Sequence, residues 1–249
     1  MMDFHCHLDL YPNAREIYKE ASRRNDFTWL VTTSPKAFAA SSRVLGASST
    51  VLITPGLHPE IAHERASELD LLMEQIATVR AVGEVGLDGS PRYRRHYEIQ
   101  RRIFSAVVER CAAVGGRTLS IHSRRAVRDV LAELARHPDY GIAILHWFSG
   151  TQAELKAAVI QGCWFSIGPA MFESANGRSL AASMPRERVV PESDGPFAKL
   201  AGETVMPWSL RVTAKYLAEL WELSVAETEE TLIANGNRLL TEMGMGGPQ

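Results

Sequence analysis

Two histidines alternate near the start of the chain, in the segment Asp3-Phe4-His5-Cys6-His7-Leu8. If this segment is a β-strand, His5 and His7 point to one side and Cys6 to the other, because successive side chains alternate across a strand. Neutral imidazole is a common metal ligand. By itself, however, such a pair is as readily structural or solvated as metal-binding, so a metal site needs further ligands elsewhere in the sequence. Cys6 is expected to be a core residue.

Further candidate ligands stand at the ends of short apolar runs. Glu84 lies in Gly83-Glu84-Val85-Gly86-Leu87-Asp88, and His122 and His146 each end an apolar run. A buried, unpaired carboxylate is energetically costly, and a bound cation offsets that cost. On its own Glu84 could equally form a structural ion pair. Together with the histidines, it favours a metal site.

The segment Glu192-Ser193-Asp194-Gly195-Pro196 supplies further carboxylates. The two-residue period of a strand predicts that Glu192 and Asp194 share one face, with Asp194 as the inward ligand. Glu192 is interpreted as an auxiliary residue behind the ligands, with a structural hydrogen bond as the alternative. Asp3 shares a face with His5 and either orients a ligand or caps the first strand.

The elements that must position these residues are indicated by hydrophobic periodicity. Short apolar runs alternate with stretches of helical period, which is typical of repeated βα units and a parallel sheet. Thr151 and Ser224 each open a capping-box sequence, which predicts the start of a helix. We count eight units, with strands expected near residues 2–5, 27–33, 51–55, 81–85, 118–122, 142–146, 164–167 and 189–194.

Eight βα units in 249 residues fit a closed (β/α)8 TIM barrel of the α/β class, with its active site where strands end and βα loops begin. The alternative is an open doubly wound sheet, but a barrel mouth gathers side chains from many strand ends more readily. No linker composition divides the chain. We expect one domain over residues 1–249, with a loose tail at 244–249.

Composition limits the possible partners. Lys and Arg number 27 and Asp and Glu 29, so a formal charge of −2 gives no global attraction for a polyanion. Nucleic acid would have to be bound by a local basic patch or by metal ions. Three cysteines without CxxC spacing argue against a disulfide framework and a thiolate zinc site. Without a signal peptide or membrane span, the expectation is a cytoplasmic protein with no membrane partner.

In its ordered motifs the chain resembles the TatD family of nucleases in the amidohydrolase superfamily. The resemblance runs over nearly the whole length, in residues 3–8, 55–59, 83–88, 121–124, 146–150, 192–196 and 235–239. It implies two divalent cations, of magnesium, manganese or zinc. One is placed on His5, His7, Glu84 and Asp194, and the second on Glu84, His122 and His146.

The same resemblance implies deoxyribonuclease activity, commonly exonucleolytic, in which a metal-activated water attacks a phosphodiester bond. Asp194 is expected to take the proton of that water and return it to the leaving oxygen, while Glu84 bridges the cations. His58, in Pro55-Gly56-Leu57-His58-Pro59, and Arg124 are candidate phosphate contacts. Their alternatives are a solvated loop histidine and an ordinary surface charge.

Three features depart from the family pattern: Trp147, Ser193 and the pair Gly89-Ser90. None removes a proposed ligand, but they leave the choice of substrate open, with DNA expected. A metal-dependent amidohydrolase or lactonase acting on a small molecule is the alternative enzyme, and it would need an enclosed apolar pocket. A partner-dependent subunit is the other alternative, including one of the TatD-like proteins of bacterial antiviral defence systems, a role that no residue chemistry supports.

Overall fold

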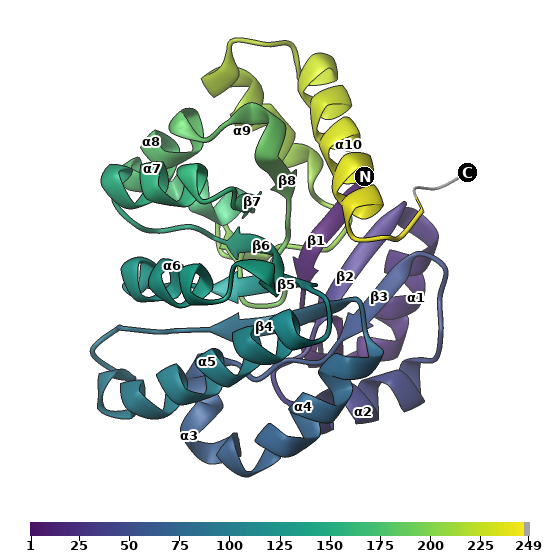
Figure 1. The fold of residues 1–249 in the computed structure, drawn as a ribbon. Coiled ribbons are helices and arrows are strands. Elements are labelled where there is room, and N and C mark those ends of the chain that lie inside the picture. The colour runs from purple at the N-terminus through teal and green to yellow at the C-terminus, as the bar shows by residue number, and fades with distance from the viewer. Residues whose placement is uncertain (247–249) are drawn as a thin grey trace. The chain divides into compact units, whose positions relative to one another are not determined.

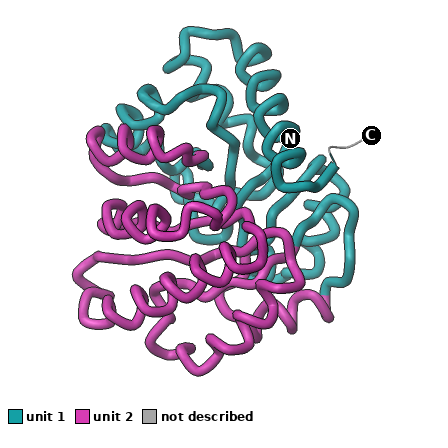
Figure 2. Tube along the Cα trace, viewed as in Figure 1, with its two compact units in different colours: residues 1–30, 45–52, 165–249 teal, residues 31–44, 53–164 magenta. Residues whose placement is uncertain are grey.

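The computed structural model describes residues 1–246, and these form two compact units assembled from separate stretches of the chain (Figure 2). Unit 1 contains residues 1–30, 45–52 and those from 165 onward, and unit 2 contains residues 31–44 and 53–164. In both, strands alternate with helices along the chain (Figure 1). No helix among the described residues has the length and apolar character needed to cross a membrane.

Unit 1 pairs its strands in parallel: β1 lies beside β2, with Met2 opposite Phe27, and β7 lies beside β8, with Phe165 opposite Val189. A short antiparallel pair, β9 and β10, follows β8. The elements that fall mainly in this unit are β1 (Met2–Cys6), α1 (Ala14–Arg24), β2 (Phe27–Val31), β7 (Trp164–Ile167), α8 (Ala175–Ser183), β8 (Val189–Pro191), β9 (Lys199–Leu200), β10 (Glu203–Thr204), α9 (Arg211–Trp221) and α10 (Val225–Glu242).

In unit 2, β5 runs parallel to both β4 and β6. The long helix α5 packs a buried stripe against this unit, because Ile103, Phe104, Val107, Val108 and Cys111 are all 3% exposed or less. The elements that fall mainly in this unit are α2 (Pro35–Leu45), α3 (Ala62–Arg65), α4 (Leu69–Thr78), β4 (Ala81–Gly86), α5 (Tyr97–Ala113), β5 (Arg117–His122), α6 (Val127–Arg136), β6 (Gly141–His146) and α7 (Gln152–Ile160). Strand β3 (Val51–Thr54) is divided between the two units.

The eight expected strands form, and seven of them have bounds within two residues of those predicted. The eighth is wrong at its end, because β8 stops at Pro191 instead of continuing to Asp194. Asp194 has a φ of +47°, a left-handed conformation that cannot continue a strand. The two-residue period therefore does not relate Glu192 to Asp194, and each of these carboxylates needs its own structural account.

Both capping boxes are confirmed. The side chains of Thr151 and Ser224 accept from the backbone N–H groups of Glu154 and Glu227, whose carboxylates accept from the capping residues in return. At the other end of α10, Gly244 has a φ of +68° and its N–H donates to the Thr241 carbonyl at 2.9 Å, which closes the helix. The last residues of the expected loose tail, 247–249, lie outside the described residues.

Replacing Ser224 with alanine removes the oxygen that accepts from the Glu227 N–H. We expect the free energy of unfolding to fall by about 1 kcal/mol, the usual effect of losing a serine N-cap. Ser224→Thr keeps the oxygen and is the matched control. Urea denaturation followed by circular dichroism measures both variants, and equal midpoints for the two would show that the box contributes nothing.

Candidate metal centre

The Glu84 carboxylate is the centre of the donor cluster in unit 2. Only 1% of Glu84 is exposed. Its Oε1 atom lies 3.0 Å from His58 Nε2, 2.9 Å from His122 Nδ1 and 2.9 Å from His146 Nε2. Three imidazole nitrogens from three different segments therefore converge on one carboxylate oxygen. The structure brings together His122 and His146, which were predicted as ligands, with His58, which was predicted as a substrate contact.

A β-bulge positions Glu84. Val82 is opposite Leu119 and Val85 is opposite Ile121, so two residues of β4 occupy the space of one residue of β5. The extra residue re-aims the side chain, as bulges commonly do beside functional sites. Glu84 instead pairs through its N–H with the Thr32 carbonyl at 3.1 Å. The backbone of a glycine packs directly against this bulge.

That glycine is Gly56. A Cβ atom at Gly56 would lie 2.4 Å from the Glu84 nitrogen and 2.5 Å from the Thr32 carbonyl oxygen. Contacts this short with backbone atoms cannot be relieved by a side-chain rotation. The close approach of the two backbones explains why a glycine stands at this position, two residues before His58.

The charges of the cluster are coupled. Burial alone would raise the pKa of the Glu84 carboxyl, but its electrostatic interactions with His58 and His146 and the hydrogen bonds from His122 and His146 hold that pKa well below its ordinary value. Burial would lower the pKa of His122, whereas its hydrogen bonds with Asp88 and Glu84 raise it to about 9. The metal-free cluster is therefore an ionised carboxylate facing protonated imidazole.

Asp88 also contacts the cluster, although its place in the sequence did not mark it as a candidate. Its Oδ2 lies 2.9 Å from His122 Nε2, so His122 is held between Asp88 on one nitrogen and Glu84 on the other. Burial would raise the pKa of Asp88, but hydrogen bonds from His122 and Ser90 lower it to about 2. Ligating histidines usually donate their second N–H to a carboxylate. Applied to the segment that contains both Glu84 and Asp88, this rule would have indicated Asp88 as the carboxylate behind a candidate ligand.

His58 differs from His122 in the partner of its second nitrogen. The Nδ1 atom of His58 accepts from the backbone N–H of Glu60 at 3.1 Å. A neutral imidazole that accepts at Nδ1 carries its proton on Nε2. The Nε2 atom of His58 is therefore a donor toward Glu84, whereas His122 Nδ1 has no such restriction because Asp88 accepts from Nε2.

Unit 1 holds a second group of donors. The Nε2 atoms of His5 and His7 lie 3.6 and 3.7 Å from Oδ1 of Asp194. All three side chains are buried. The left-handed backbone of Asp194 is fixed by its N–H, which donates to the His5 carbonyl at 2.9 Å. Two imidazoles and one carboxylate from segments far apart in the sequence thus form one cluster.

Asp3 and Ser193 support this second group. The Ser193 hydroxyl donates to Asp3 Oδ2 at 2.6 Å, and the backbone N–H groups of Ser193 and His5 donate to Oδ1 at 3.0 and 3.2 Å. Burial raises the pKa of Asp3 to about 7, although the hydrogen bonds from Ser193 act against it. Asp3 therefore ties β1 to the Asp194 segment, which favours the orienting role over simple capping of the strand.

The other predicted residues, Glu192, Arg124 and Cys6, make hydrogen bonds with neighbours that are not candidate ligands. Glu192 is fully buried and accepts from the Ser166 hydroxyl at 2.5 Å. Arg124 is exposed in the turn after β5, and its backbone carbonyl accepts from the Gly89 N–H at 2.9 Å. Cys6 is fully buried, its thiol donates to the Gly195 carbonyl at 3.4 Å, and burial raises its pKa, so the prediction of a core residue is confirmed.

Known proteins resemble this chain over its length. The sequence profile of the TatD related DNase family matches residues 2–241. The chain belongs to the TatD family. A human TatD-family protein named Deoxyribonuclease TATDN3 is 25% identical over 98% of this chain and 95% of its own. A protein of Edwardsiella piscicida named 3'-5' ssDNA/RNA exonuclease TatD is 32% identical over 58% of this chain and 57% of its own.

The fold agrees with that membership. The crystal structure of YJJV, a TatD homologue from Escherichia coli, superposes with a TM-score of 0.83 at 23% identity, covering 96% of this chain and 97% of that one. This likeness confirms the predicted α/β, TIM-barrel fold class. Further relatives carry the name metal-dependent hydrolase. The TatD-family chain described here is accordingly a metal-dependent hydrolase.

The donors of unit 2 suit a divalent cation. Candidate ligand atoms of His58, Glu84 and His122 lie within 4.8 Å of one another. Imidazole nitrogen with carboxylate oxygen is a donor set typical of zinc and manganese, and magnesium accepts carboxylate oxygen most readily. Among these three residues, the tautomer of His58 favours Glu84 and His122 as ligands.

Asp88→Asn keeps a similar shape and the turn with Ser90 but removes the charge that accepts from His122. We expect the affinity for manganese to fall by about tenfold to a hundredfold, the usual effect of changing a carboxylate behind a ligating histidine. Asp129→Asn, which changes an acceptor of the Tyr97 hydroxyl, is the matched control. Isothermal titration calorimetry measures both, and equal affinities would refute the role of Asp88.

The pKa of His122 predicts how metal binding depends on pH. Because that pKa is raised to about 9, His122 carries a proton at pH 7.5 in the metal-free protein, and a ligating imidazole must lose it. Affinity should therefore rise as pH increases toward 9, with about one proton released per cation bound in unit 2. Calorimetry in phosphate and in Tris at the same pH detects the release, and identical heats in the two buffers would contradict it.

Proposed function

We propose that this TatD-family chain is a metal-dependent nuclease that hydrolyses phosphodiester bonds in DNA, acting from a strand end. The observation that carries the proposal is the convergence of three imidazole nitrogens on one oxygen of the buried Glu84 carboxylate. Family membership supports the deoxyribonuclease activity. The exonuclease name of the Edwardsiella relative supports the exonucleolytic mode.

The proposal assigns two divalent cations, of magnesium, manganese or zinc. Glu84, His122 and His146 would hold one, and His5, His7 and Asp194 would be ligands of the other. On the family resemblance, Glu84 is assigned to both. When bound, such cations neutralise phosphate charge and lower the pKa of a water molecule toward neutrality.

The residues of the chain then have separate tasks. Asp194 is the proposed general base: its carboxylate accepts the proton of the attacking water and returns it to the leaving oxygen. His58 donates from Nε2, the nitrogen that carries its proton, to a phosphate oxygen. Arg124, exposed after β5, is the proposed second phosphate contact. Asp3 and Glu192 hold their neighbours by hydrogen bonds and take no part in the proton transfer.

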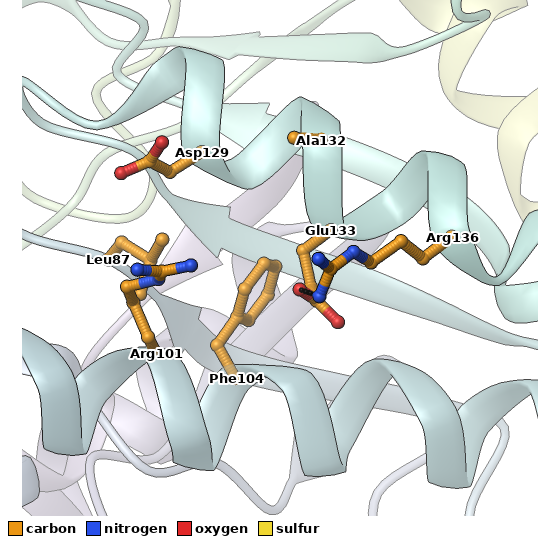
Figure 3. A pocket seen from close by; sticks show the side chains of 7 residues that line it. All are labelled: Leu87, Arg101, Phe104, Asp129, Ala132, Glu133 and Arg136. Atoms are coloured by element: carbon orange, nitrogen blue, oxygen red, sulfur yellow. Dashed lines mark hydrogen bonds and ion pairs between the residues drawn. The ribbon is translucent and has the colours of Figure 1, made fainter.

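The small-molecule alternative has no support from the pocket between α5 and α6 (Figure 3). That pocket is lined by Leu87, Arg101, Phe104, Asp129, Ala132, Glu133 and Arg136, so charged side chains outnumber the apolar ones. It contains none of the candidate ligands, whereas an amidohydrolase or lactonase needs an enclosed apolar pocket at the metals. The names of the relatives give no support to the role in antiviral defence, which stays a prediction, as does the cytoplasmic location.

Digestion of end-labelled single-stranded and duplex DNA with magnesium or manganese tests the proposal. Glu84→Gln should lower cleavage by at least about a hundredfold, more than the loss expected for a residue behind the ligands. EDTA should abolish cleavage. Glu68→Gln, which changes another buried carboxylate of unit 2, is the matched control and should retain activity. Failure of folded, metal-loaded wild type to cleave DNA would overturn the nuclease proposal.

A further inference from the structure

An exposed aromatic ring borders the donors of unit 1. Phe197 is 60% exposed, and its ring centroid lies 5.1 Å from that of His7, with the rings at 79°. Single exposed apolar side chains are common and carry no function by themselves. This ring, however, contacts a proposed metal ligand and lies three residues beyond Asp194. Phe197 therefore lies beside the residues that are proposed to bind metal and to transfer the proton.

The turn that carries Phe197 is firmly held. The N–H of Phe197 donates to the Asp194 carbonyl at 3.0 Å, and the N–H of His7 donates to the Gly195 carbonyl at 2.8 Å. A Cβ atom at Gly195 would lie 1.9 Å from the Tyr11 hydroxyl oxygen, so the turn fits against Tyr11 without spare room. A ring on such a turn loses little conformational entropy when a ligand stacks on it.

We propose that Phe197 is a stacking platform for the base of the nucleotide whose phosphate is cleaved. The inference rests on the proposed nuclease function and adds a substrate contact to it. Bases stack on aromatic side chains irrespective of their sequence, since every base presents a π-face. The base and phosphate of one nucleotide are joined through a single sugar. A base on Phe197 would therefore bring its phosphate beside His7 and Asp194.

Two other aromatic residues follow the candidate ligand His146 in the sequence. Phe148 is fully buried, which assigns it to packing, and Trp147 is only partly exposed. The structure thus favours Phe197, which follows Gly195-Pro196 in the sequence. Because a stacked base contributes binding energy at the cleaved nucleotide, cleavage should be faster from an end that carries a base than from an abasic end.

Three oligonucleotides test the inference: one fully natural, one with an abasic nucleotide at the 5′ end and one with it at the 3′ end. Phe197→Leu should lower kcat/KM on the natural strand about tenfold, since a base stack is worth a factor of this order, and leave cleavage from the abasic end unchanged. Phe197→Trp should restore the natural rate. Ile233→Ala, which changes an exposed apolar residue of α10, is the matched control.

Binding gives a readout that does not depend on turnover. With calcium in place of the active cation, a terminal 2-aminopurine should lose fluorescence on wild type and Phe197→Trp but not on Phe197→Leu. In the cleavage test, an equal fall in kcat/KM on natural and abasic strands for Phe197→Leu, or no fall on either, would overturn the stacking role while leaving the nuclease proposal intact. Wild type that cleaves none of the strands would remove the nuclease proposal, and the stacking role with it.

Discussion

The buried charge of Glu84 is the constraint on which the centre of unit 2 depends. Removing a carboxylate from water costs several kcal/mol even after the protein relaxes. Here the cost is offset by three imidazoles that share one of its oxygens. Each imidazole must come from a different segment, since no single strand can surround one atom. The charge of the Glu84 side chain therefore holds three segments of the unit together.

The backbone near Glu84 shows what that arrangement requires. The bulge in β4 turns Glu84 away from regular pairing, and Gly56 allows the neighbouring segment to approach its backbone. From the other side, the Gln100 side chain accepts from the Asp88 N–H at 2.7 Å. Asp88 in turn holds His122. Helix α5 is thus linked to the centre by a chain of hydrogen bonds and not only by its apolar stripe.

Local patterns in the sequence were sufficient for the strands and the capping boxes, because each depends on neighbours within a few residues. The sequence also indicated the donor side chains of the two clusters, although their role as ligands and the grouping taken from the family resemblance stay predictions. The bulge at Glu84 and the left-handed Asp194 depend on distant backbone, such as Thr32 and His5, and no local period reveals them. For this reason the two-residue period of a strand wrongly predicted that β8 continues to Asp194.

Residue type also cannot separate the roles of equivalent imidazoles. His58 and His122 both face the same oxygen of Glu84, yet the Glu60 N–H fixes the proton of His58 on the facing nitrogen. Asp88 does the opposite for His122 by accepting at the far nitrogen, which leaves the facing one available to a cation. Under the proposed function, the same side chain is a donor to phosphate at His58 and a ligand to metal at His122, and the partner behind each ring decides between the two roles.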